Sequence, residues 1–468
     1  MTRRRPIRNL GAGPNWRRRR PEAPLTAHAK VRESAAFVLE RTLESRAPAS
    51  TFLDGALERC DPRDHGLLRE LVLGTLRWLR FIDHVLVSAS GRPLSRIQRA
   101  LLAPLRIAVY QLFFLDRVPA HAAVNEAVEQ ATGRTHAGGA SFVNGVLRRI
   151  ARSAHRDAWP VEADDPAVRL GILHSHPDLL VERWLRTYGE TRTIAILTAN
   201  NRPKPLHLLA FRDRGGRALL AEQLIDDDVG VEPSVLAPHC LTVQWGNPLF
   251  SEAYRRGAFY VQDEASQLAA LVPPPAPRER VLDIAAAPGG KTFALLAEQP
   301  DARCVASDVS LRRLQTMRLN AARLDLTPLL CAADGAALPF RDRFDRVVVD
   351  LPCTGTGTLR KHPELKWRIS RAEIERLAEQ ARSLVGGAAA CVRPGGLLVV
   401  LTCSIEPEEN EDVVAAFLGS RSDFSRRDLS ADLRRPAADH VEAPGLWRML
   451  PAEGHDGFTV QALRRTAG

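Results

Sequence analysis

Two apolar stretches of the chain each lead into a cysteine. Val347–Val349 is followed by Asp350 and Cys353, and Leu397–Leu401 is followed by Cys403. A thiol has a pKa near ~8.5 and becomes a useful nucleophile when a neighbouring cation or helix terminus lowers that pKa. One cysteine after a strand is more often an inert core residue. Two cysteines at the same edge of a sheet indicate a site for covalent chemistry.

A third apolar stretch, Val281–Ile284, runs into a loop of small residues that precedes a predicted helix. Such residues let the backbone approach a ligand closely. A phosphate-binding loop would need glycine where this chain has Ala285, and the dinucleotide fingerprint G-x-G-x-x-G is absent. The loop therefore predicts a cradle for a ligand without a phosphate chain. Its residues are Ala285, Ala286, Ala287, Pro288, Gly289, Gly290 and Lys291.

Two aspartates follow the next predicted strands. Asp308 lies 18 residues after Gly290, and Asp334 follows the apolar Leu329–Cys331. A carboxylate in the first of these positions can accept hydrogen bonds from ribose hydroxyls. Each aspartate alone is more often a helix cap or a turn residue. Together with the loop, they outline a nucleoside pocket of the S-adenosylmethionine type.

These groups fit the chemistry of methylation at C5 of cytosine. C5 is not nucleophilic by itself, but a thiolate that adds at C6 makes C5 electron-rich enough to take a methyl group from a sulfonium donor. A base must then remove the C5 proton as the sulfur leaves. One cysteine would attack, a second group would assist elimination, and a carboxylate such as Asp350 would bind the N3/N4 edge of the base. The spacing alone leaves open which thiol attacks.

The elements around these residues predict three folded parts. From Arg280 onward, continuous apolar strands alternate with helices, which is typical of a doubly wound, Rossmann-like α/β domain whose ligands bind at the carboxyl ends of the strands. We expect this domain over residues 261–468. Residues 163–260 predict a small α+β subdomain with strands at 206–211 and 240–244. Residues 26–155 carry apolar side chains at 3–4 spacing and predict an all-α domain.

The composition of the chain indicates its compartment and its class of partner. The net charge is +10, but residues 1–20 carry eight arginines and no acid, so the rest of the chain nets about +2. We expect residues 1–25 to form a disordered arginine-rich arm, which either attracts phosphate groups or is simply solvated. No apolar run reaches the ~18 residues of a membrane span and no hydrophobic leader is present, so we expect a cytoplasmic protein without a membrane partner. The seven cysteines contain no C-x-x-C pair, so we expect no metal site.

The longer motifs resemble RNA cytosine-5 methyltransferases of the NOL1/NOP2/Sun family. The resemblance lies in "AAAPGGKT", in "DLPCTGTGTLRKHPELKW" at 350–367 and in "LTCSIEPEEN" at 401–410. Residues 26–152, with "DPRDHGLLRELVLGTLRW" and "SFVNGVLRRI", resemble the NusB-like RNA-binding domain that is fused to the bacterial branch acting on 16S rRNA. Altogether the resemblance covers residues 26–465. It implies an S-adenosyl-L-methionine-dependent methyltransferase and an RNA-binding role for the small subdomain.

The resemblance also implies the roles of the thiols. In this family the cysteine of the T-C-S motif, here Cys403, attacks the base, and that of the D-x-P-C motif, here Cys353, assists product release. S-adenosyl-L-methionine would lie against residues 285–291, Asp308, Asp334 and Asp350. DNA cytosine-5 methyltransferases attack with the P-C cysteine instead, which makes them the nearest alternative. The family often has cysteine at the position of Ala285, and we expect cofactor binding to survive this difference.

The segment "LRKHPELKW" is expected to contact the RNA, because cations beside an aromatic residue suit phosphates and unstacked bases. The alternative is a solvated loop with Trp367 packed beneath it. The expected partner is 16S rRNA or a small-subunit assembly intermediate, bound by a monomer. A pure RNA-binding or antitermination factor with a vestigial methyltransferase half is a second hypothesis. The RNA-contacting residues of the segment would be Arg360, Lys361, His362 and Lys366.

Overall fold

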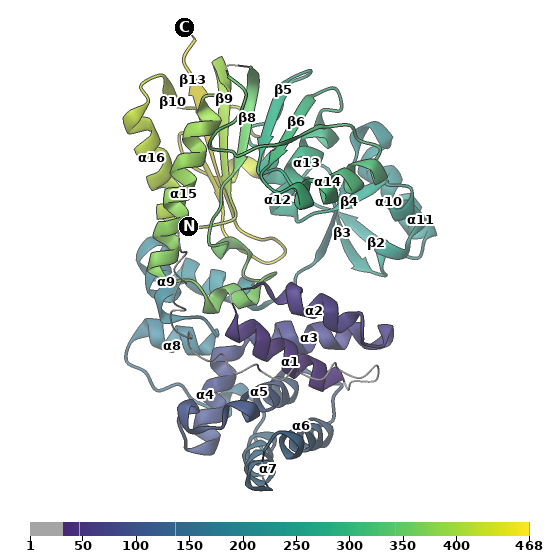
Figure 1. Ribbon diagram of the computed structural model, residues 1–468, viewed down its shortest axis with the longest axis vertical. Helices are drawn as coiled ribbons and strands as arrows, with labels where there is room; N and C mark the ends of the chain where they lie inside the picture. The colour runs from purple at the N-terminus through teal and green to yellow at the C-terminus, as the bar shows by residue number, and fades with distance from the viewer. Residues whose placement is uncertain (1–30, 46, 136, 342, 468) are drawn as a thin grey trace, which may run out of the picture.

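A helical part and two β-sheets make up the protein, and the computed structural model describes residues 31–45, 47–135, 137–341 and 343–467. The helical part lies at one end of the molecule and the larger sheet at the other (Figure 1). The expected arm at residues 1–25 lies outside the described residues. Within the described ranges, no helix is long and apolar enough to cross a membrane.

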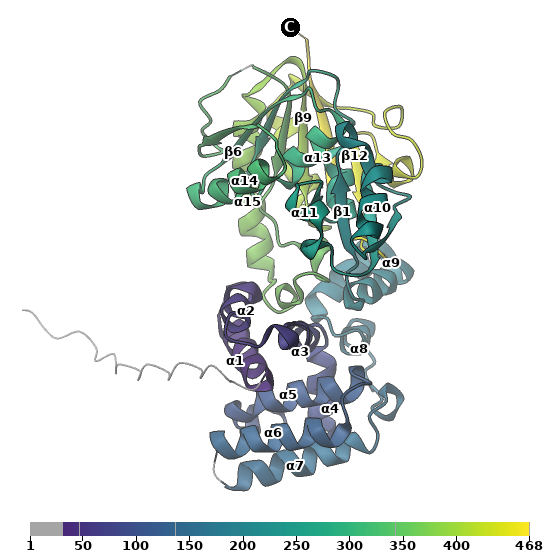
Figure 2. The same cartoon turned by 90° about the vertical axis from the view of Figure 1, so that its right-hand side faces the viewer.

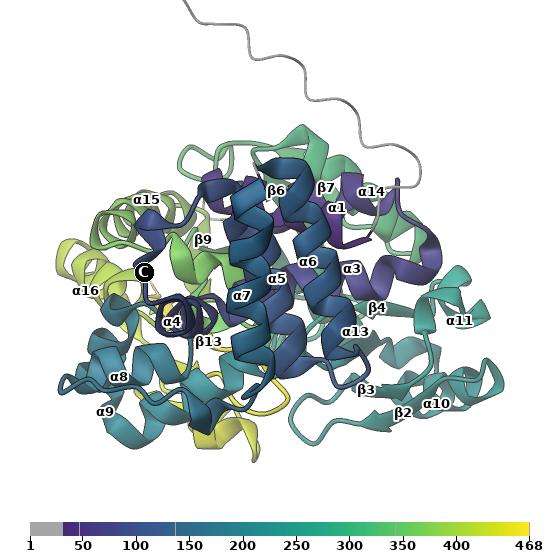
Figure 3. The ribbon, with the colours of Figure 1, turned by 90° about the horizontal axis from the view of Figure 1, so that it is seen from below.

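The helical part follows the apolar spacing of its sequence. Leu101, Leu105 and Leu147 belong to the predicted apolar repeats, and all three are buried. Figure 3 shows three of the helices, α5, α6 and α7, side by side. The helices are α1 (Val31–Glu44), α2 (Ala49–Leu57), α3 (His65–Arg77), α4 (Leu79–Ser90), α5 (Arg99–Phe114), α6 (Ala120–Arg134) and α7 (Ala137–Ala151).

Two further helices lead from the helical part to a small four-stranded sheet. The predicted strands at 206–211 and 240–244 are present and pair antiparallel as neighbours in the order β2-β3-β1-β4. The second of these helices, α9, is interrupted at Gly189, where φ is 74°, and continues after this break. The elements are α8 (Pro166–Leu173), α9 (Asp178–Asn201), β1 (Leu206–Ala210), α10 (Gly216–Asp226), β2 (Gly230–Pro233), β3 (Cys240–Trp245), α11 (Glu252–Arg255) and β4 (Phe259–Val261).

The larger sheet has nine strands, and its central strands are parallel, as the alternation of strands and helices predicts. The sequence analysis did not predict the antiparallel strands that follow β9 and extend the sheet through β13. The strands are β5 (Arg280–Ile284), β6 (Arg303–Asp308), β7 (Leu329–Ala332), β8 (Phe344–Asp350), β9 (Val392–Thr402), β10 (Phe424–Arg426), β11 (Val441–Ala443), β12 (Leu446–Met449) and β13 (Phe458–Arg465).

Helices cover both faces of this sheet, which explains why its strands are continuously apolar. Val348 of β8 faces the side with α12 and α13, whereas its neighbours Val347 and Val349 face α15 and α16. Figure 2 shows the covered sheet standing above the helical part. The covering helices are α12 (Glu264–Ala270), α13 (Gly290–Glu298), α14 (Leu311–Arg323), α15 (Arg371–Ala389) and α16 (Glu411–Ser420).

The loop after β8 joins the sheet to the helical part. Trp367 Nε1 donates to the Leu76 carbonyl of α3 at 2.9 Å. Arg368 Nη2 donates to the carbonyls of Thr42 at 3.0 Å and Ala47 at 2.6 Å. The residues that follow Cys353 in sequence are therefore anchored on another part of the molecule.

Candidate active site

The two cysteines singled out from the sequence meet at the carboxyl ends of adjacent strands. β8 and β9 run parallel with Asp350 opposite Leu401, so the turns after both strands emerge at the same edge. Cys353 Sγ and Cys403 Sγ lie 3.4 Å apart. Both thiols are free, because no disulfide joins them. The parallel register thus brings together side chains that are fifty residues apart in sequence.

An ion pair lies beside the thiols. Lys291 Nζ at the start of α13 is 2.5 Å from Asp350 Oδ2 at the end of β8. Burial opposes the charge of Lys291, but Asp350 outweighs it, so the pKa of Lys291 is raised from its ordinary value. The negative charge of the Cys403 thiolate also raises the pKa of this lysine. The last residue of the predicted cofactor loop is therefore a permanent cation next to the reactive carboxylate and thiol.

The surroundings distinguish the two thiols. The hydrogen bond from Cys353 lowers the pKa of Cys403 below its ordinary value, and the Lys291 ammonium acts in the same direction. That hydrogen bond, together with burial, raises the pKa of Cys353 well above its ordinary value. These opposite directions make Cys403 the thiol more readily ionised and Cys353 the one that more readily stays protonated.

A cavity of about 580 Å³ opens beside the thiols at the carboxyl edge of the sheet. This volume is in the range of small-molecule sites. Six of the predicted site residues line it, whereas Ala286, Ala287, Pro288, Gly289, Gly290 and Lys291 do not. The six are Ala285, Asp308, Asp334, Asp350, Cys353 and Cys403.

The loop from β5 to α13 is shaped by contacts at both of its ends. Thr292 Oγ1 donates to the buried Asp283 Oδ2 at 2.6 Å, which ties the end of the loop to its start. Gly289 has a φ of 115°, and a Cβ there would lie 2.4 Å from the Phe293 ring. Ala285 also has a positive φ, of 58°, and faces the cavity. Gly289 thus serves the close turn of the backbone at the start of α13, whereas the close approach of this loop to a ligand stays a prediction.

The donor set of the cavity fits a nucleoside-type cofactor. Asp308 Oδ1 accepts the Ser310 amide at 2.9 Å, but the buried Asp308 Oδ2 has no hydrogen-bond partner among the described residues. The guanidinium of Arg313 lies 3.3 Å from that oxygen as an ion pair. A carboxylate oxygen without a donor at the end of a strand suits a ligand hydroxyl.

Some cavity residues were missed by the sequence analysis. Val309 and Arg313 also line the cavity, and their position shortly after Asp308 is the sequence signal that points to them. Gln380, Ser383 and Leu384 reach the cavity from α15. No sequence signal marks these three, because only the packing of α15 against the sheet brings them there.

The expectation that Arg360 and Lys366 contact RNA disagrees with their burial. Lys366 is fully buried and donates to the carbonyls of Arg77 and Ser175, each at 3.2 Å, and to Asn201 Oδ1 at 2.8 Å. Arg360 is also buried, and its Nη2 lies 3.3 Å from Asp456 Oδ1. Both side chains form hydrogen bonds or ion pairs that join different parts of the protein, so they are not available to RNA. Trp367 packs against the helical core, as the alternative reading expected.

The other two residues predicted to contact RNA, Lys361 and His362, remain accessible. Lys361 is exposed, and its side chain forms no ion pair within the described part of the chain. Partial removal from water and the charge of Lys204 lower the pKa of Lys361. The charge of Cys403 acts in the opposite direction and raises it. His362 is partly exposed and lies 3.9 Å from Glu364 Oε1. Lys361 is thus an exposed amine that forms no ion pair among the described residues.

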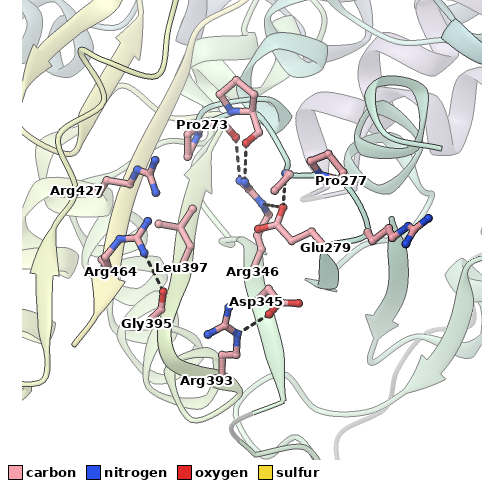
Figure 4. A pocket seen from close by; sticks show the side chains of 13 residues that line it. Pro273, Pro277, Glu279, Asp345, Arg346, Arg393, Gly395, Leu397, Arg427 and Arg464 are labelled. Carbon is pink, nitrogen blue, oxygen red and sulfur yellow. Dashed lines mark hydrogen bonds and ion pairs between the residues drawn. The ribbon is translucent and has the colours of Figure 1, made fainter. Parts of the chain in front are cut away.

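A second cavity, of about 420 Å³, lies at the opposite end of the sheet. Figure 4 shows Arg346, Arg393 and Arg464 of this cavity bound to protein groups. Arg346 donates to the carbonyls of Pro273 and Pro274, both at 2.9 Å, and pairs with Glu279 at 3.0 Å. These contacts fix the proline-rich segment that precedes β5, so we assign this cavity a structural role.

Comparison with known proteins agrees with this geometry. Residues 270–464 match the family described as 16S rRNA methyltransferase RsmB/F, residues 29–152 match the NusB family, and residues 176–249 match the RsmF/B-like ferredoxin-like domain. A solved structure described as PH0851 is 26% identical with a TM-score of 0.75, over 93% of this chain and 99% of that chain. NSun6 from Pyrococcus horikoshii, crystallised with SFG, has a similar fold at 20% identity and a TM-score of 0.54, over 63% of this chain and all of that one.

Relatives match nearly the whole chain. The probable ribosomal RNA small subunit methyltransferase B of Bacillus subtilis (strain 168) is 32% identical over 93% of this chain and 98% of its own length. The ribosomal RNA small subunit methyltransferase B of Vibrio cholerae serotype O1 is 33% identical over 93% of this chain and 97% of its own length. The chain therefore belongs to the 16S rRNA methyltransferase RsmB/F family.

Proposed function

We propose that the protein transfers a methyl group from S-adenosyl-L-methionine to C5 of a cytosine in 16S rRNA, through a covalent bond between Cys403 and C6 of the base. The observation that carries this proposal is the pair of thiols, 3.4 Å apart, on the wall of a cavity that also presents strand-end carboxylates. Both chemical requirements, a nucleophile for C6 and a pocket for the methyl donor, are met at one edge of the sheet.

The proposed reaction divides the work between the two thiols. The Cys403 thiolate adds to C6, and the electron pair displaced to C5 takes the methyl group. The C5 proton then passes to a base, and the C6–S bond breaks with its electrons returning to Cys403. Cys353 assists this elimination by donating its proton to the leaving sulfur. Asp350, held by Lys291, is placed to bind the N3/N4 edge of the cytosine.

S-adenosyl-L-methionine would supply the electrophilic methyl group in this scheme. We propose that Asp308 and Asp334 bind its polar groups, with Ala285 and Asp350 at the cavity wall and the remainder of loop 285–291 shaping the backbone. The co-crystallised SFG of the NSun6 structure, an S-adenosylmethionine analogue, supports this choice of cofactor. The unpartnered Oδ2 of Asp308 provides an acceptor for a hydroxyl group.

Replacing Asp308 by asparagine is expected to weaken cofactor binding by about 10- to 100-fold, because a charge-assisted hydrogen bond contributes ~1.5–3 kcal/mol. Isothermal titration with S-adenosyl-L-methionine measures the change. The matched control is Asp301→Asn, a half-exposed aspartate outside the cavity that is expected to bind normally. Equal affinities of the two variants would remove Asp308 from the proposed cofactor site.

Replacing Lys361 by glutamine is expected to weaken RNA binding and to lower the slope of log K against log salt by about 0.7–0.9, the loss of one phosphate contact. Fluorescence anisotropy with an rRNA fragment at several salt concentrations measures both quantities. Arg278→Gln is the control, since this arginine is 86% exposed and lies at the opposite cavity of the sheet. A slope unchanged from the native protein would exclude a phosphate contact by Lys361.

We further propose domain limits of 26–155, 163–260 and 261–468, with the first two domains gripping folded RNA. Elements α1–α7 fall within the first range, β1–β3 within the second, and all nine strands of the larger sheet within the third, while β4 ends one residue past the second limit, at Val261. The NusB-type and ferredoxin-like matches support the division.

The proposed function is tested by transfer of tritiated methyl groups to three substrates: naked 16S rRNA, a small-subunit assembly intermediate and duplex DNA. We expect transfer to one of the two RNA substrates, with bisulfite mapping locating the modified cytosine. Transfer to duplex DNA alone would favour a DNA methyltransferase. Failure to bind S-adenosyl-L-methionine in titration would favour an RNA-binding factor without activity.

A further inference from the structure

Glu409 is a fully buried carboxyl group that contacts the residue next to Cys353. It lies at the end of a short helical turn just before α16. Its Oε1 accepts the Thr354 amide at 2.7 Å, and its Oε2 accepts the Thr354 hydroxyl, also at 2.7 Å. Both carboxylate oxygens thus accept hydrogen bonds from Thr354, in the loop that carries Cys353.

This loop has few other anchors. Its first bond is from the Leu351 amide to the Leu401 carbonyl at 2.9 Å, and the next backbone bond to the sheet is from Gly357 to the Cys403 carbonyl, also at 2.9 Å. Between them, Thr356 Oγ1 lies 3.1 Å from Ser404 Oγ and accepts the Ile405 amide at 3.0 Å. Within residues 352–355, the described chain offers only Glu409 as a hydrogen-bond partner from another element, apart from the contact between the thiols. Of these bonds, the pair to Glu409 lies nearest to Cys353 in sequence, so the position of Cys353 depends more on Glu409 than on the others.

The segment that carries Cys403 is held more firmly. The Ser404 carbonyl accepts from Thr459 Oγ1 at 2.9 Å and from Asn410 Nδ2 at 3.1 Å. Cys403 itself follows β9, whose backbone pairs with β8 and β13 on either side. The Ser404 hydroxyl also hydrogen-bonds with Glu409, but that bond is one of several. Loss of Glu409 would therefore displace Cys353 more than Cys403.

The energetics of this carboxyl group favour a specific role. Glu409 forms no ion pair among the described residues, and burial raises its pKa to about 7. A buried carboxyl group without a cation is costly unless its hydrogen bonds compensate. The bonds that compensate are those that orient the two thiol segments.

We propose that Glu409 is a positioning residue that holds Cys353 against Cys403, so that product release depends on it more than nucleophilic attack does. This inference rests on the proposed two-thiol reaction. It assigns to Glu409 no contact with the substrate, and its effect is transmitted through Thr354.

The Glu409→Ala variant is expected to accumulate a covalent RNA–protein adduct, as is expected of the Cys353→Ala variant. Misplacement of a catalytic group by about 1 Å can slow a step ~100-fold, so we expect release to slow by about 10- to 100-fold while adduct formation in a single turnover changes little. Glu409→Gln should release product faster than Glu409→Ala, because its amide oxygen still accepts the Thr354 amide. Rapid-quench denaturing gels measure adduct and free methylated RNA separately.

Controls separate positioning from a loss of stability. Glu406→Gln alters a neighbouring buried carboxyl group that binds Arg183 at 2.6 Å and Trp184 at 2.8 Å, and it is expected to cause no adduct accumulation. Thr354→Val removes the hydroxyl donor to Glu409 without altering Glu409 itself. It is expected to raise the adduct fraction by less than Glu409→Ala, and it serves as the test if the alanine variant does not fold.

The outcomes distinguish the inference from the proposed function. If Cys353→Ala forms no adduct, the two-thiol reaction is wrong, and the inference falls with it. If Cys353→Ala forms the adduct but Glu409→Ala releases product like the native protein, the inference alone is overturned. If the alanine variant does not fold, the other two variants decide. Product release at the native rate by both Thr354→Val and Glu409→Gln then overturns the inference as well.

Discussion

The Cys403→Ala variant is expected to lose methyl transfer to rRNA by about 10⁴-fold or more, because removal of a covalent nucleophile leaves no route to an electron-rich C5. Cofactor affinity should remain within a few-fold of the native value, since Cys403 contributes one part of a wall that Asp308 and Asp334 also form. Tritiated-methyl transfer and calorimetric titration measure the two quantities.

The control for this variant is Cys60→Ala, which removes a thiol of the helical part far from the cavity in sequence and should retain activity. A pH profile gives a second readout. The native single-turnover rate should rise with pH as Cys403 ionises, with a midpoint below the ~8.5 of an ordinary thiol, since the Cys353 hydrogen bond and Lys291 lower the pKa of Cys403. Substantial transfer by Cys403→Ala would exclude it as the nucleophile.

The Cys353→Ala variant is expected to trap the enzyme on its substrate. The variant loses the Cys353 hydrogen bond that lowers the pKa of Cys403, but the Lys291 ammonium still lowers it, so attack and methyl transfer should proceed at a reduced rate. The adduct should then persist, because the thiol that lies 3.4 Å from the leaving sulfur is gone. Denaturing electrophoresis with labelled rRNA should show most of the enzyme as a covalent RNA–protein complex, where the native protein shows a small fraction.

The double variant Cys353→Ala/Cys403→Ala is the matched control and should show no adduct. The reverse pattern, in which Cys403→Ala traps RNA and Cys353→Ala does not transfer methyl groups, would exchange the two roles. That pattern would make the reaction resemble the one in which the P-C cysteine attacks. The raised pKa of Cys353 argues against this exchange, because a thiol that stays protonated is a poor nucleophile.

Much of the site could be predicted because it lies at the ends of strands. The apolar runs 347–349 and 397–401 identify buried parallel strands, and parallel strands place their following residues at the same edge. The structure accordingly brings Cys353, Cys403 and Asp350 together. Asp308 and Asp334 were predicted by the same logic, and both line the cavity.

The charged segment after Cys353 shows where such reasoning fails. Its composition of cations beside Trp367 is typical of an RNA contact, but composition does not specify what the backbone will place around each side chain. Lys366 is surrounded by acceptors from Arg77, Ser175 and Asn201, which belong to distant parts of the sequence. Lys361, five residues earlier, is exposed.

The sequence by itself determined the alternation of strands and helices from β5 to β9, the small-residue loop 285–291 and the two thiols, because these depend on local periodicity and on residues that follow strand ends. Only the tertiary structure decided which thiol is the more acidic, since that depends on the placement of Lys291 and on the 3.4 Å contact between the sulfurs. It also decided that Glu409 binds the loop of Cys353. Both results require contacts between segments far apart in the chain, which no local pattern encodes.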